Sequence, residues 1–164
     1  MSTDSTDTTS AVTLWKSLTD QQRLMAAEAF WRKTDSADQQ VEAMVVLAQK
    51  LKARPKFIAT LPVARKAKHL AQLVGMPEAL AARLLVSYHL GHQRPLMAAF
   101  LDAAGIPHAD GLIDEAMEGP IDAGKLAAGA AALSSAHPEA DVRLYFQTLL
   151  LQDPDTWSGL QAHL

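Results

Sequence analysis

The fold is decided by one stretch of the chain, residues 77–105, which reads PEALAARLLVSYHLGHQRPLMAAFLDAAG. Twice in this stretch a proline begins an apolar segment and a glycine follows it, first at Pro77 and Gly91 and then at Pro95 and Gly105. Proline is favoured in the first turn of an α-helix, and glycine just after the last turn. The stretch therefore predicts two consecutive helices joined by a short break.

The same punctuation continues along the rest of the chain. Another helix end is predicted at Gly75, and helix starts are predicted at four further prolines: Pro62, Pro120, Pro138 and Pro154. Residues 19–22 (TDQQ) and 36–39 (SADQ) have the form of a capping box, in which a hydroxyl residue is followed three positions later by glutamine. The apolar spacing also predicts an amphipathic helix across residues 112–117.

These signals favour an all-α fold. No segment alternates apolar and polar residues for long enough to predict a strand. We expect a disordered polar tail at residues 1–12 and a single helical domain at 13–164, a compact and irregular arrangement of about eight or nine short helices. The alternative is a short α-solenoid of helix pairs, since Arg-Pro recurs at 54–55 and 94–95, although the repeat extends no further.

The composition limits the chemistry and the location. The chain has no cysteine, which excludes disulfides, thiolate nucleophiles and Cys-ligated metal sites and suits a reducing compartment. It shows neither a signal peptide nor an apolar run that approaches the roughly 20 residues of a membrane span. We therefore expect a soluble, cytoplasmic protein with no membrane association, and we predict no cofactor and no bound metal.

Charge is segregated along the chain behind a net charge of only −3. Residues 43–101 hold nine basic residues and one acidic residue, whereas residues 102–164 hold two basic and ten acidic residues. No carboxylate occurs between Glu42 and Glu78. Such a basic segment suits an anionic small molecule or an acidic protein partner, with Arg65 and Lys68 as candidate ligand-binding residues.

Two other interpretations of the basic segment stay open. It can be a solvated face, or it can be neutralised by the acidic part of the same chain. Nucleic-acid binding is disfavoured, because the segment lacks the interleaving of exposed aromatic residues and glycines that is typical of such proteins and the whole chain is slightly acidic.

A second candidate site lies at the helix break from Tyr88 to Pro95. It contains His89, His92 and Arg94, and His108 follows in the sequence. Imidazoles can ligate a metal or act as general acid and base, and an arginine can hold an anionic substrate. Histidine near the end of a helix is also favoured for local reasons, because it interacts with the negative end of the helix dipole.

Two classes of function follow. The first is a helical binding or interaction module, with a protein partner or a second copy of the chain, that uses the basic segment 43–101. The second is a small metal-dependent or His-based enzyme, or a ligand-binding protein, with its site at residues 88–95 and His108. No motif of the chain identifies a substrate.

Overall fold

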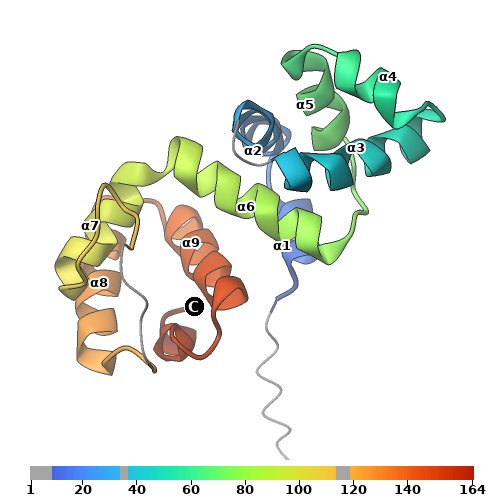
Figure 1. The fold of residues 1–164 in the computed structure, drawn as a ribbon. Coiled ribbons are helices and arrows are strands. Elements are labelled where there is room, and N and C mark those ends of the chain that lie inside the picture. Colours follow the sequence, from blue (N-terminus) through green and yellow to red (C-terminus); the bar gives the residue numbers. More distant parts are fainter. Residues whose placement is uncertain (1–8, 34–36, 114–118) are drawn as a thin grey trace, which may run out of the picture. The chain divides into compact units, whose positions relative to one another are not determined.

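The computed structural model describes residues 9–33, 37–113 and 119–164. Within these ranges the chain forms nine α-helices, one 3-10 helix and no strand, which confirms the predicted all-α fold (Figure 1). The chain divides into two compact units. The N-terminal unit is Ala11–Gln93, and the C-terminal unit is Arg94–Leu164 together with Met1–Ser10. From the sequence we expected a single helical domain over residues 13–164, and this stays a prediction, because the division into two compact units does not decide it.

Helix α2 is the centre of the N-terminal unit. The helices described in this unit are α1 (Ala11–Ser17), α2 (Asp20–Arg32), α3 (Ala37–Leu51), α4 (Pro55–Thr60), α5 (Val63–Ala71) and α6 (Glu78–His92). Helix α2 packs against both α5 and α6 through a buried face that includes Ala26, Ala27 and Phe30. In a solenoid each repeat contacts only its neighbours, so this packing of distant helices favours the irregular fold over the solenoid alternative.

The crossing of α2 and α6 depends on Gly91. A Cβ atom at this position would lie 2.9 Å from the Cβ of Ala29, closer than side chains approach one another. Gly91 was predicted to end its helix, but α6 continues to His92. Its role is to let the two backbones approach rather than to terminate the helix, and only the tertiary structure reveals that difference.

Helix α1 is held by three long-range hydrogen bonds. The carboxylate of Glu78, the first residue of α6, accepts hydrogen bonds from the backbone N–H groups of Ala11 and Val12. The indole N–H of Trp15 donates to the carbonyl of Leu73 over 2.8 Å. A helix of seven residues is marginal in isolation. These contacts therefore supply much of what keeps α1 formed.

Both ends of α2 are capped by side chains. The predicted capping box is confirmed, because Thr19 and Gln22 bond reciprocally through their side chains and backbone N–H groups. At the other end the amide of Gln40, on α3, donates to three carbonyl groups: those of Phe30, Trp31 and Lys33. The second predicted capping box begins at Ser36, which lies outside the described residues.

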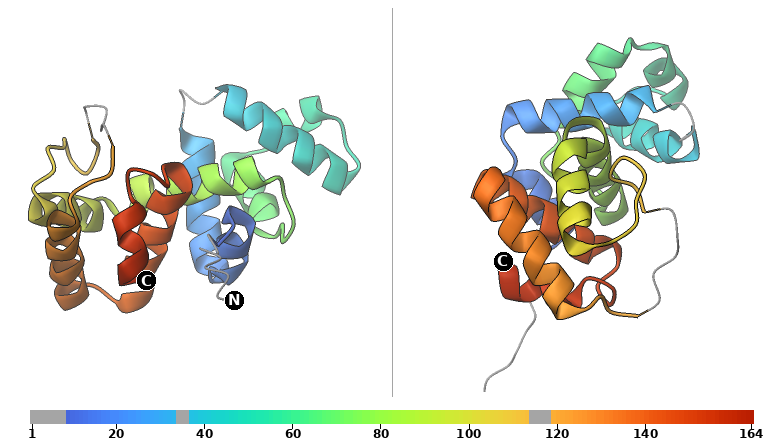
Figure 2. Two further views of the ribbon diagram at one scale, coloured as in Figure 1. Left: turned by 90° about the horizontal axis from the view of Figure 1, so that it is seen from below. Right: turned by 90° about the vertical axis from the view of Figure 1, so that its left-hand side faces the viewer.

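Phe100 is the centre of the C-terminal unit. The helices described in this unit are α7 (Arg94–Ala104), α8 (Ala123–Ala136), α9 (Glu139–Gln152) and the 3-10 helix η1 (Ser158–His163) (Figure 2). The fully buried ring of Phe100 contacts three aromatic rings, with centroid distances of 5.6 Å to Tyr145, 5.2 Å to Phe146 and 6.1 Å to Trp157. Helix α8 passes close to this cluster at Gly129, where a Cβ atom would lie 2.6 Å from the Phe100 ring.

Most of the predicted helix boundaries are close to the observed ones. Pro62, Pro77 and Pro138 immediately precede α5, α6 and α9, and Pro95 is the second residue of α7. Gly105 follows α7 in the left-handed conformation (φ 69°). The N–H of the next residue bonds back to the carbonyl of the fifth residue before it, as in a Schellman motif.

One predicted helix end and two predicted helix starts are wrong. Helix α5 ends at Ala71, four residues before the predicted end at Gly75. Helix α8 begins at Ala123 rather than at Pro120, because the Asp122 carboxylate caps it and the N–H of Ile121 is bonded to the carbonyl of Thr156. Pro154 lies in a turn that leads to η1 and not to an α-helix. In that turn the Asp153 carboxylate accepts hydrogen bonds from the hydroxyl and backbone N–H groups of Thr156.

Two further predictions fall partly outside the described residues. Residues 114–117 of the helix predicted at 112–117 lie outside the described residues. Leu112, which is described, pairs with Ala109 in an isolated bridge. Residues 1–8 of the disordered tail predicted at 1–12 also lie outside the described residues. Helix α1 begins within that predicted tail, at Ala11, whose side chain is fully buried.

No helix in the described ranges combines the length and the hydropathy that crossing a bilayer requires.

We expect the Glu78 cap to contribute measurably to stability. Substitution Glu78→Ala should lower the free energy of unfolding by about 1 kcal/mol, the usual effect of removing a helix cap. Glu139→Ala is the matched control, because Glu139 also opens a proline-preceded helix but its carboxylate makes no hydrogen bond or ion pair with the described residues. Urea denaturation of both variants checks this, and equal losses would contradict a specific role for Glu78.

The contact between Gly129 and Phe100 makes a second prediction about stability. Gly129→Ala should improve the intrinsic helix propensity by about 1 kcal/mol, yet overpacking against the ring should cost about 1–3 kcal/mol. We expect a net loss in thermal stability. In a Phe100→Leu background the same substitution should be neutral or stabilising. Additive effects in this double-mutant cycle would show that the two positions do not interact.

Candidate functional site

Of the residues predicted to bind a ligand, two lie on α5, two on α6 and two in the C-terminal unit. In chain order they are Arg65, Lys68, His89, His92, Arg94 and His108.

His89 is a core residue of the N-terminal unit. Its side chain is 3% exposed, and its Nδ1 lies 2.8 Å from the carbonyl oxygen of Leu85, one turn earlier on α6. The ring of Tyr88 meets it edge-on, with centroids 5.3 Å apart. Desolvation by burial lowers the pKa of His89 to about 4, and the hydrogen bond to Leu85 opposes that shift. The imidazole is therefore neutral at physiological pH and is shielded from solvent.

His92 lies on the same helix but in a different environment. Its side chain is exposed, and its ring lies 6.1 Å from that of Tyr88. The Tyr88 hydroxyl accepts a hydrogen bond from the Gln93 amide over 3.2 Å. The structure thus separates the two histidines of α6, because one is enclosed in the core and the other faces solvent.

Arg94 and His108 are brought together at the turn of residues 108–111. One guanidinium nitrogen of Arg94 donates to the backbone carbonyl of Asp110 over 3.1 Å. The Nδ1 atom of His108 accepts the N–H of Gly111 at 3.0 Å, and its Nε2 donates to the Asp102 carboxylate at 2.6 Å.

These contacts give Arg94 and His108 a structural role in that turn. Asp110 and Gly111 both have positive φ angles, 51° and 85°, so the turn needs support. Both ring nitrogens of His108 are engaged, which fixes the Nε2–H tautomer and leaves no lone pair for a metal. Across the described residues, no three His, Asp or Glu side chains are grouped so that they could hold a metal ion.

The two units differ in charge. The N-terminal unit contains twelve Lys and Arg residues and six Asp and Glu residues, a net charge of +6. Arg94–Leu164 contains three basic and ten acidic residues, a net charge of −7. The segregation seen along the chain is therefore also a property of the folded units.

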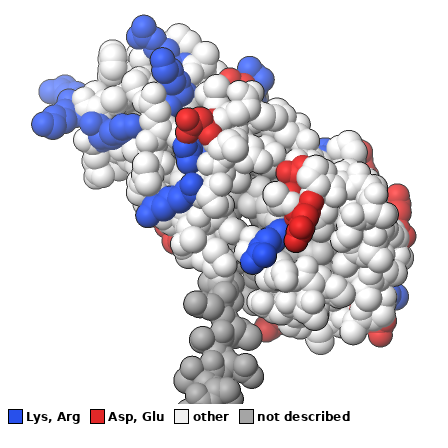
Figure 3. All heavy atoms as spheres, turned by 180° about the vertical axis from the view of Figure 1, so that it is seen from behind, with Lys and Arg blue, Asp and Glu red and all other residues white. Residues whose placement is uncertain are grey.

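Within the N-terminal unit, basic side chains gather over α3–α5 (Figure 3). Lys66 lies over the Trp31 ring, 4.7 Å from its centroid, and the Nζ of Lys50 lies 3.5 Å from a backbone carbonyl oxygen. Five other cations are exposed and form no ion pair with the described residues. We call these the basic surface: Lys52, Arg54, Lys56, Arg65 and Lys68.

Exposed apolar side chains also occur on α3 and α4. Phe57, next to Lys56 on α4, is 54% exposed, and Val41 and Val45 of α3 are 52% and 41% exposed. From the sequence we expected no exposed aromatic residues interleaved with the basic residues of this segment, and the exposure of Phe57 corrects that expectation. Its neighbour Ile58 is fully buried, so the short helix α4 points one side chain inward and the next outward.

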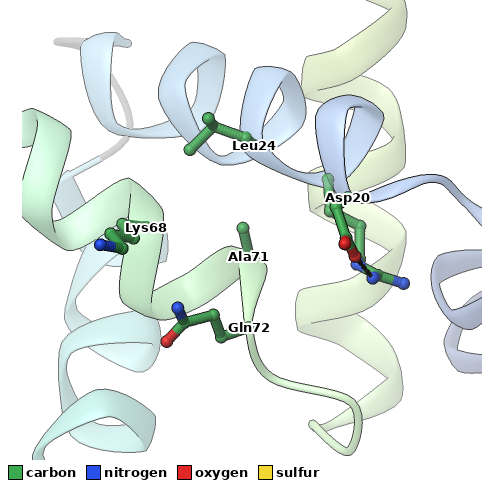
Figure 4. Close-up of a pocket in the computed structure, with 6 residues that line it drawn as sticks. Asp20, Leu24, Lys68, Ala71 and Gln72 are labelled. Atoms are coloured by element: carbon green, nitrogen blue, oxygen red, sulfur yellow. Dashed lines mark hydrogen bonds and ion pairs between the residues drawn. The ribbon is translucent and has the colours of Figure 1, made fainter.

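A pocket of about 360 Å³ lies between α2 and α5 in the same unit (Figure 4). Helix α2 contributes Asp20, Arg23 and Leu24, and helix α5 and its end contribute three more residues: Lys68, Ala71 and Gln72. Among the residues singled out as ligand-binding from the sequence, only Lys68 lines it. The side chain of Leu24 is only partly buried where it lines the pocket.

Comparison with models of protein families, with curated proteins and with solved structures found no match to this chain.

The burial of His89 predicts a pH dependence of stability. Its pKa is lower in the folded state than in the unfolded state, so unfolded chains bind more protons between pH 6.5 and pH 4. The contribution of His89 to the free energy of unfolding should be fully present above pH 6.5 and should be lost as the pH drops toward 4. The loss from this group should reach up to about 3 kcal/mol.

Urea denaturation across this pH range, with His89→Gln and His92→Gln, checks the assignment. The pH-dependent component should be smaller in His89→Gln and unchanged in His92→Gln. An NMR titration of the folded protein in which the His89 ring has a midpoint near 6.5 would contradict the assignment.

Proposed function

We propose that this protein is a helical binding module whose basic surface binds an acidic protein partner. The observation that carries the proposal is the set of five exposed cations on α3–α5 that form no ion pair with the described residues. Their cause lies in the sequence, which has no carboxylate between Glu42 and Glu78. Uncompensated charge of one sign attracts a partner of the other sign and accelerates association with it.

The backbone at Lys52 supports the proposal independently. Lys52 follows α3 in the left-handed conformation (φ 53°), and the N–H of Ala53 bonds back to the carbonyl of Ala48. Glycine is the favoured residue at this position of a helix end, since a side chain there costs about 1 kcal/mol. The chain thus carries a cation where glycine would be more stable, as expected where charge serves binding.

The exposed apolar side chains favour a protein over other anionic partners. Phe57 lies beside Lys56, and Val41 and Val45 are exposed on α3. Protein interfaces combine apolar anchors with a charged rim. Aliphatic side chains give no stacking with nucleic-acid bases, so these valines add nothing to a nucleic-acid interface.

The alternative function, a His-based enzyme at residues 88–95 with His108, has less support. His89 is enclosed in the core, and both ring nitrogens of His108 are used by neighbouring groups. A general acid or base needs a ring nitrogen within reach of a substrate. A location in the cytoplasm remains part of the proposal, supported by the absence of cysteine from the chain.

A peptide-binding experiment tests the proposed function. The probe is a fluorescein-labelled peptide of Glu and Leu residues, and fluorescence anisotropy measures its affinity at several salt concentrations. We expect binding that weakens as salt rises, because screening reduces attraction between exposed charges. Arg54→Gln/Lys56→Gln/Arg65→Gln should weaken binding roughly tenfold, from three exposed charge contacts.

Two variants test whether binding depends on the basic surface itself rather than on the net charge of the protein or on loss of folding. Lys16→Gln/Lys125→Gln/Arg143→Gln removes three exposed cations elsewhere and should leave the affinity within about twofold of the wild type. Lys52→Gly should weaken binding while raising thermal stability. Equal losses from both triple variants, or tighter binding of a single-stranded oligonucleotide than of the peptide, would overturn the proposal.

A further inference from the structure

We propose that the pocket between α2 and α5 is a separate site for a small organic carboxylate with an apolar body. Its volume of about 360 Å³ lies within the range of about 300–1,000 Å³ that is typical of ligand sites. All of its lining residues belong to the N-terminal unit. Its chemistry divides into an apolar part and a cationic part.

The apolar part is formed by Leu24 and Ala71. Leu24 projects from α2 into the space that faces α5, and Ala71 lies opposite it in Figure 4. The space exists because Ala71 has only a methyl side chain at a position where a larger residue would fill it. The half-buried Leu24 side chain offers apolar surface that a ligand would remove from water, which favours binding.

The cationic part is supplied by Lys68. Arg23 also lines the pocket, but its guanidinium is already engaged with the Asp20 carboxylate and with the carbonyl of Leu18 at 3.1 Å. Lys68 forms no ion pair with the described residues. Because Asp20 offsets Arg23, the lining carries one net positive charge, from Lys68.

Gln72 completes the polar side of the pocket. It stands four residues after Lys68, so the two side chains are neighbours on one face at the end of α5. Both residues line the pocket, and an ammonium and an amide N–H are donors that suit the oxygens of a carboxylate. A ligand with its carboxylate at Lys68 and Gln72 would place its apolar body against Leu24 and Ala71.

The test uses hexanoate, with hexanol and hexylamine as its uncharged and cationic analogues. Titrations followed by amide NMR should show saturable shifts with hexanoate, centred on the pocket residues of α2 and α5. Hexanol should bind about tenfold more weakly, because it lacks the charge that Lys68 recognises. We expect no saturable shifts with hexylamine.

Three variants locate the binding. Lys68→Gln should reduce hexanoate affinity to that of hexanol, whereas Lys33→Gln, which removes an exposed cation of the same unit outside the pocket, should leave it unchanged. Ala71→Leu should abolish binding by filling the space. It removes no charge and should leave binding of the acidic peptide intact, which separates this site from the proposed protein interface.

Several results would overturn the inference. These are the absence of saturable hexanoate binding, equal affinities for hexanoate and hexanol, or equal effects of Lys68→Gln and Lys33→Gln. If Ala71→Leu does not fold, as judged by circular dichroism, Leu24→Ala replaces it. Leu24→Ala should weaken the binding of hexanoate and of hexanol equally, because it removes apolar contact and no charge. Unchanged binding of both ligands would also overturn the inference.

Discussion

The packing of α2 against both α5 and α6 is the constraint on which the N-terminal unit depends. On one side it requires the close approach of Gly91 to Ala29. On the other side, Ala67 and Leu70 of α5 are fully buried. Once that face of α5 is directed inward, helical geometry turns Arg65 and Lys68 outward. The basic surface and the α2–α5 pocket are thus two consequences of one packing arrangement.

Local signals in the sequence predicted most helix boundaries correctly. Proline before α5, α6 and α9 and the capping box of α2 act within one helical turn, so a short window of sequence contains all the information needed. The errors occurred where a distant group decides the boundary. The backbone bond from Ile121 to Thr156 keeps Ile121 out of α8, and no local pattern reveals it.

The same distinction applies to the candidate site. The sequence showed that cations gather between Glu42 and Glu78, because a run without carboxylates is visible directly. It did not show which of these cations are exposed and form no ion pair with the described residues, because that depends on how the helices pack. It did not separate His89 from His92, since burial depends on which helix packs against α6. It also could not show the pocket, because the space at Ala71 depends on the distance between two helices.

The hydrogen bonds from Ala11 and Val12 to Glu78 also affect the order in which the chain folds. The partners are separated by 67 and 66 residues, so the cap cannot form until the beginning of α6 has been synthesised. Contacts between residues so far apart cost loop-closure entropy before they contribute stability, and they slow folding. On the ribosome, therefore, α1 is expected to be among the last helices of its unit to become stable, although it is synthesised before the other helices described there.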